Sequence, residues 1–145
     1  PTYTTPYDPG RMMLNMKGLP IHPCRHKITL QQRLASLTGH LVEINAPNTG
    51  LEPGRLQRVF PKNFIKVQGE LFVPSSLNSV RVFDVKPPVK TMLVGVRTTF
   101  PTRGAFNRIR LIRIGADFIE LLAKDKNRSR ILLPLNKVEG IFPVK

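Results

Sequence analysis

Residues 64–80 read FIKVQGELFVPSSLNSV, and residues 118–138 read FIELLAKDKNRSRILLPLNKV. The second stretch repeats the first, with a longer loop in its middle and a two-residue gap after its proline. Self-similarity over roughly fifty residues is typical of a duplicated module. We therefore expect two similar units in this chain of 145 residues. Each unit would be marginally stable alone, because a small unit buries a small share of its surface, so the two should pack against each other or against other subunits.

The residues around the first copy have the alternation and the turn signals of short strands. Leu41 and Glu43 alternate with Val42 and Ile44, as in a half-buried strand. Further short strands are expected at 56–59, 63–67, 70–73 and 79–85, with one helical turn after Pro74. Strands at this spacing are typical of a small antiparallel barrel.

One short helix is expected before these strands. Its face would consist of Leu30, Leu34 and Leu37, with Thr29 as its N-cap and Gly39 at its end. In the second unit, residues 108–114 form a long strand whose apolar parity changes between Leu111 and Ile112, which predicts a β-bulge there. Matched positions of the two copies predict the cores: Phe64, Ile65, Val67, Val73 and Val80 in the first, and Phe118, Ile119, Leu121, Leu133 and Val138 in the second.

The N-terminal segment, residues 1–28, is rich in proline and is expected to be an extended arm. It also contains an apolar cluster formed by Met12, Met13, Leu14 and Met16. Flexible methionine side chains adapt to irregular surfaces. The cluster either covers an edge of its own domain or docks on a neighbouring subunit as an assembly arm. The first barrel unit would then span 29–85 and the second 86–145.

The formal net charge of the chain is +14. Residues 86–145 contain thirteen basic and four acidic side chains, which places +9 of the total in the second unit. A charge of this size favours polyanionic partners such as nucleic acid, an anionic polymer or an acidic protein. The candidate residues for binding such a partner are Arg108, Arg110, Arg113, Arg128 and Arg130. The alternative is a solvated basic face.

No enzyme motif is present, so we expect a non-enzymatic protein with no catalytic residues, no cofactor and no small-molecule substrate. His22, Cys24 and His26 have the spacing of a soft-metal site but lack a distant fourth ligand, and we expect no metal there. The N-terminus lacks the apolar stretch of a secretory signal, and no apolar run is long enough for membrane insertion. These features favour intracellular synthesis and a cytoplasmic location unless the chain enters a larger structure.

A Gly-x-Leu-x-x-Val strand, a Phe-Ile strand and an apolar-apolar-Pro segment follow one another in the first unit. The positions concerned are Gly54, Leu56, Val59, Phe64, Ile65, Val73, Pro74, Leu77 and Val80. This pattern resembles the Sm-like small barrel, and more narrowly the tandem Sm-like modules of the spore coat protein B family, over roughly residues 36–143. The second copy departs from it, because Phe106 or Asn107 stands where the turn glycine would be.

The resemblance implies a mainly β fold with two tandem Sm-like or SH3-like small β-barrels. It also implies a structural protein of a spore coat or envelope, whose partners are copies of itself and other envelope proteins. Barrel edges and the N-terminal arm would join the copies, because an open sheet edge is a template for pairing with another chain. The alternative is an Sm-like nucleic-acid-binding protein that uses the basic second unit. Against this alternative, Phe and Tyr are not interleaved with the arginines as stacking platforms for bases.

Overall fold

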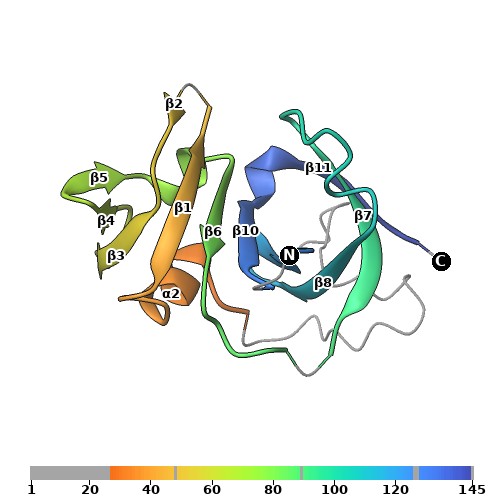
Figure 1. The fold of residues 1–145 in the computed structure, drawn as a ribbon, viewed down its shortest axis with the longest axis horizontal. Coiled ribbons are helices and arrows are strands. Elements are labelled where there is room, and N and C mark those ends of the chain that lie inside the picture. Colours follow the sequence, from red (N-terminus) through yellow and green to blue (C-terminus); the bar gives the residue numbers. More distant parts are fainter. Residues whose placement is uncertain (1–26, 48, 89, 126–127, 145) are drawn as a thin grey trace, which may run out of the picture.

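The computed structural model describes residues 27–47, 49–88, 90–125 and 128–144. This part of the chain is mainly β, with one short helix beside an antiparallel sheet (Figure 1). The prediction of a mainly β fold with a short helix before the first strands is therefore confirmed.

Residues 29–85, the first half, contain the helix and the first strands. They are α2 (Leu30–Ala35), β1 (Leu41–Ala46), β2 (Thr49–Gly50), β3 (Gly54–Val59), β4 (Ile65–Val67), β5 (Glu70–Phe72), the 3₁₀ turn η1 (Pro74–Ser76) and β6 (Ser79–Val82). Residues 86–145, the second half, contain the remaining elements. They are β7 (Met92–Thr98), β8 (Ile109–Ile114), β9 (Phe118–Leu122), β10 (Arg130–Pro134), the 3₁₀ turn η2 (Leu135–Lys137) and β11 (Val138–Pro143).

The two halves share one strand order within a common sheet. The order along the sheet is β11-β7-β8-β9-β10-β6-β1-β3-β4-β5, and β2 pairs with β1 beside this path. In each half the last strand pairs with the first, and the next three strands follow in chain order. The halves meet where β10 pairs with β6, with Leu132 opposite Val80 and Ile131 opposite Arg81. The sheet does not close on itself among the described residues: β5 lies at one end of the strand order and β11 at the other. In Figure 1, β5 lies at the left and β11 runs over the right-hand half.

The helix and the bulge occur where the sequence predicts them. The Thr29 hydroxyl accepts a hydrogen bond from the Gln32 amide, while the Gln32 side chain accepts one from the Thr29 amide, so a capping box starts the helix. Leu30 and Leu34 are buried, as the helical spacing predicts. In β8 the register with β9 shifts between Leu111 and Arg113, which confirms a bulge at this point of the strand.

Among the described residues, two hydrophobic clusters form the core, one for each half. Most of the predicted core positions are buried in them, whereas Val73 and Val138 are only partly buried. The prediction for Phe64 is wrong, because its side chain is 43% exposed. Ile65 takes the inward position, and strand alternation turns its neighbour outward. Phe118 is fully buried, but it packs in the cluster of the first half rather than in that of its own half.

Candidate functional site

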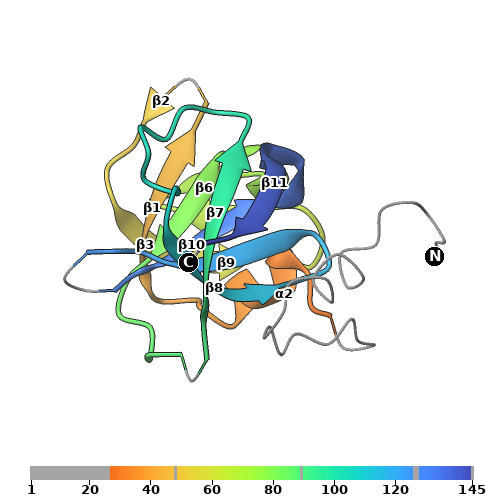
Figure 2. The same cartoon turned by 90° about the vertical axis from the view of Figure 1, so that its right-hand side faces the viewer.

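Three of the five candidate arginines line one groove, which we call the hairpin groove. Arg108, Arg110 and Arg128 border a space of about 420 Å³ between β8 and the loop that joins β9 to β10, together with Lys124 and Asp125. All three arginines are exposed. The described ends of this loop project from the body of the molecule (Figure 2). Four cationic side chains and one carboxylate therefore face a single open surface.

Asp125 fixes the base of the loop. Its carboxylate accepts hydrogen bonds from the Ser129 amide at 3.0 Å and from the Ser129 hydroxyl at 2.6 Å, and Arg81 lies 3.4 Å away. Burial raises the pKa of Asp125, but the Ser129 hydrogen bonds and the Arg81 charge outweigh it and leave this pKa below its ordinary value. Asp125 is therefore ionised at neutral pH, and its backbone carbonyl accepts a hydrogen bond from the Arg128 amide at 3.1 Å.

Arg113 and Arg130, the other two candidates, belong to a separate cluster around Glu120. Glu120 is fully buried, and Arg33 from α2 donates to both of its carboxylate oxygens at 2.9 Å. Arg113 Nε lies 3.1 Å from Oε1, and Arg130 Nε lies 3.6 Å from Oε2. The structure thus divides the predicted set between two places on the second half, and we call this group the Glu120 cluster.

Glu120 and Arg33 did not stand out in the sequence as functional residues. A usable signal was present, because Glu120 is a single acidic residue within the apolar strand Phe118–Leu122. A strand that is apolar along its whole length is buried on both of its faces, so a carboxylate within it is buried too. A buried carboxylate needs a cationic partner. The partner comes from the helix of the first half, 87 residues earlier in the chain, and nothing local predicts it.

The sheet ends supply a second type of candidate site. Among the described residues, neither β5 nor β11 has a second partner strand. The exposed large hydrophobic side chains lie at or near these ends: Leu71 in β5 is 52% exposed, Phe142 in β11 is 40% exposed, and Phe64 immediately precedes β4. Exposed apolar side chains on an unpaired strand are typical of surfaces that pair with another chain.

The internal repeat explains why these positions are apolar. In the strand pairings Phe72 lies opposite Ile65 and Leu133 lies opposite Ile119, so Phe64 corresponds to Phe118 and Leu71 corresponds to Leu132. Phe118 and Leu132, which lies in the β10–β6 pairing, are fully buried in the cluster of the first half. The same two positions are therefore buried where a neighbouring unit is present and exposed where none is described.

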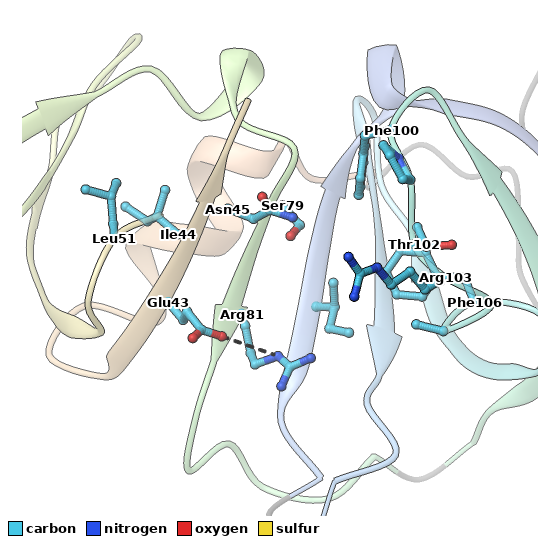
Figure 3. A pocket seen from close by; sticks show the side chains of 13 residues that line it. Glu43, Ile44, Asn45, Leu51, Ser79, Arg81, Phe100, Thr102, Arg103 and Phe106 are labelled. Atoms are coloured by element: carbon cyan, nitrogen blue, oxygen red, sulfur yellow. Dashed lines mark ion pairs between the residues drawn. The ribbon is translucent and has the colours of Figure 1, made fainter. Parts of the chain in front are cut away.

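A further pocket of about 420 Å³ lies between β1 and β6 on one side and the loop around residues 100–106 on the other. Figure 3 shows Glu43 and Arg81 facing each other across its floor, with a distance of 4.0 Å between charged atoms. Phe100, Arg103 and Phe106 face them from the second half. The lining of this pocket combines apolar side chains with one ion pair. Ser79 and Thr102 supply its hydroxyl groups, and no histidine in the lining could act as a base toward either hydroxyl.

The predicted assembly arm, including its apolar cluster at Met12, Met13, Leu14 and Met16, lies outside the described residues except for Lys27 and Ile28. His22, Cys24 and His26 lie outside them as well. Within the described ranges, no group of three or more His, Cys, Asp or Glu side chains is placed to hold a metal ion. No helix in the described part of the chain has the length and apolar character to cross a membrane.

Comparisons with protein-family models, with curated proteins and with solved structures found no match. The hairpin groove and the sheet ends are therefore the two surfaces that bear on function.

Proposed function

We propose that this chain is a non-enzymatic assembly protein in which two Sm-like small-barrel modules form a unit that joins further copies through its sheet ends. The shared strand order of the halves and their separate hydrophobic clusters support the two modules. The resemblance of the repeat pattern to the spore coat protein B family supports a spore coat or envelope as the setting. Other envelope proteins and the N-terminal arm, residues 1–28, belong to this proposal as further partners and contacts.

The single observation that carries the assembly proposal is the β10–β6 pairing between the halves. It joins the fourth strand of one unit to the last strand of the other, not counting β2. The two strands at the free ends of the sheet are also a fourth strand and a last strand. Without β2, β5 is the fourth strand of the first half, and β11 is the last strand of the second half. Pairing of β11 from one copy with β5 of the next repeats the internal junction.

The repeat also supports an expected register for this intermolecular pairing. In the internal junction Leu132 lies opposite Val80, and Ile131 lies opposite Arg81. Within each half, the strand pairings make Leu71 equivalent to Leu132 and Ile141 equivalent to Val80. Leu71 is therefore expected to lie opposite Ile141 of the neighbouring copy. Side chains directly opposite each other in an antiparallel pair have Cβ atoms about 4.5–5.5 Å apart, which is close to what a disulfide requires.

Disulfide trapping tests this register. In a Cys24→Ser background, the double variant Leu71→Cys/Ile141→Cys is expected to form a ladder of covalent oligomers on mild oxidation, seen on a non-reducing gel. The two cysteines lie on β5 and β11, the two ends of the strand order, so the ladder requires pairing between chains. The control Arg55→Cys/Ile141→Cys moves the first cysteine to an exposed position on β3. A ladder of equal length in the control, or none in either variant, would contradict the proposal.

The hairpin groove supports a second candidate function, the binding of nucleic acid. Its lining contains Arg108, Arg110, Lys124 and Arg128 against the single carboxylate of Asp125. Cationic side chains on one face neutralise phosphates and release counterions, so affinity falls with salt.

Replacing Arg108, Arg110 and Arg128 with Ser is expected to weaken binding to a single-stranded RNA homopolymer. The slope of log affinity against log salt concentration should fall by about 2, because each lost phosphate contact on a single strand contributes about 0.7. Fluorescence anisotropy at several salt concentrations measures both quantities. The control replaces Arg55, Arg58 and Lys62 of the first half, which removes the same charge. Equal losses in the two triple variants would assign the binding to net charge alone.

A further inference from the structure

The Glu120 cluster borders a pocket of about 570 Å³ between the halves, distinct from the hairpin groove. The first half contributes Arg33 from α2 and His40 before β1, and the second contributes Arg113, Glu120 and Arg130 from β8, β9 and β10. The connection between the halves closes one side with Asp84 and Lys86. Pockets that hold small organic ligands have about this volume.

The charges of this lining do not balance. Arg33, Arg113, Arg130 and Lys86 supply four positive charges, and Glu120 and Asp84 supply two negative ones, which leaves +2 with His40 neutral. Arg33 already occupies both oxygens of Glu120 with hydrogen bonds. The one buried carboxylate is therefore shared by three guanidinium groups, and a further anion in the pocket would offset the remaining charge.

The guanidinium of Arg130 is held in place by backbone carbonyls. Its Nη1 donates to the Arg128 carbonyl at 2.8 Å, and its Nη2 donates to the Lys86 carbonyl. Burial lowers the pKa of Arg130; the Glu120 charge raises it, and the nearby charges of Arg33, Arg113 and Arg128 lower it again, so it lies below its ordinary value. Burial is the main cause of this direction, and the neighbouring guanidinium charges act in the same sense.

Arg113 is the group placed to bind a ligand. Its Nε is buried and, although 3.1 Å from Glu120 Oε1, has no hydrogen-bond partner among the described residues. The side chain as a whole is 43% exposed. It thus combines a buried, unsatisfied N–H with an accessible guanidinium end at the wall of the pocket. The bulge in β8 sets this position, because it places Arg113 opposite Glu120 in the register with β9.

We propose that this pocket is a binding site for the phosphoryl group of a small molecule, with Arg113 as its principal donor. A guanidinium group presents N–H donors in a planar fork that matches phosphate oxygens in two-point contacts. His40 lines the same pocket. Its Nδ1 lies 2.8 Å from the Phe83 carbonyl, and because a carbonyl only accepts hydrogen bonds, Nδ1 is the ring nitrogen that bears the proton. The site is independent of the sheet ends and of the hairpin groove.

Isothermal titration calorimetry with inorganic phosphate and with glycerol 3-phosphate tests the site. One-to-one binding is expected for the wild-type protein, and Arg113→Gln should weaken it by about tenfold or more, since a charge-assisted two-point contact is lost. The control is Arg58→Gln, which removes the same charge from an exposed position of β3 outside the lining of this pocket and should leave binding unchanged. Tighter binding of the ester identifies an organic phosphate as the ligand, and equal or tighter binding of inorganic phosphate identifies the free ion.

Two results would overturn the proposal: no saturable binding of either probe to the wild-type protein, or equal loss in both variants. Equal loss would mean that the net charge of +14 attracts phosphate without a site. Circular dichroism spectra and thermal unfolding of each variant confirm that the comparison is made between folded proteins. Arg113→Lys provides a second measurement, because it keeps the charge but loses the two-point geometry, and it is expected to bind phosphate more weakly than the wild-type protein.

Discussion

Replacing Glu120 with Gln is expected to lower the free energy of unfolding by about 3–5 kcal/mol, the largest effect of any charge-removing substitution in the described chain. The carboxylate is fully buried, and Arg33, Arg113 and Arg130 surround it within 3.6 Å. Arg130 is itself only 2% exposed, so its charge would remain buried without compensation. A neutral amide of the same shape keeps the packing and removes only the charge. Urea unfolding followed by circular dichroism measures the loss.

The matched control for this substitution is Glu43→Gln. Glu43 pairs with Arg81 at 4.0 Å, but its side chain is 45% exposed. Exposed ion pairs contribute little, so a loss below about 1 kcal/mol is expected there. A similarly small loss for Glu120→Gln would show that the three arginines do not depend on this carboxylate.

Truncating Phe118 to Ala is expected to cost about 3–5 kcal/mol, because the ring is fully buried and its removal leaves a cavity. Phe118 packs with residues of the first half, including Leu30 and Leu34 of the helix. The substitution should therefore also loosen the contact between the halves, which faster amide hydrogen exchange in α2 would report.

Phe64→Ala is the control, since Phe64 occupies the equivalent position of the first half and is 43% exposed. In the monomeric state it should cost less than about 1 kcal/mol, in line with the small effect of most surface substitutions. A loss of 3 kcal/mol or more for Phe64→Ala in dilute monomeric protein would mean that the two positions are equally buried, against the structure.

Local patterns in the sequence predict most of the individual elements. The capping box at Thr29 and the leucine spacing define the helix, and the change of apolar parity after Leu111 predicts the bulge in β8. These features depend on residues close in the chain. The pairing of β10 with β6 joins strands about fifty residues apart, and sequence patterns contain no direct signal for such distant contacts.

The candidate sites show the same division between local and distant information. The sequence correctly locates Arg110 on a strand, whereas Arg108 lies directly before it. Grouping these two with Arg113 and Arg130 overlooks the bulge that places Arg113 opposite Glu120 and the burial of Arg130. The error at Phe64 has the same origin. Phe118, the matched position in the second half, is buried by the first half of the same chain. Phe64 has no equivalent neighbouring half among the described residues, and the repeat pattern alone does not show this difference.

Joining the two halves within one chain has a geometric consequence for the proposed assemblies. One end of each chain differs from the other, so successive copies all point in the same direction, and the assembly has a polarity. Contacts of this head-to-tail kind give a closed ring when the rotation from copy to copy returns to its start, and an open helical fibre when it does not. Every chain contributes two halves, so a ring built in this way always contains an even number of them. A fragment limited to residues 29–85 would offer β5 to the free β11 at one end of an assembly and its exposed β6 to the free β5 at the other end.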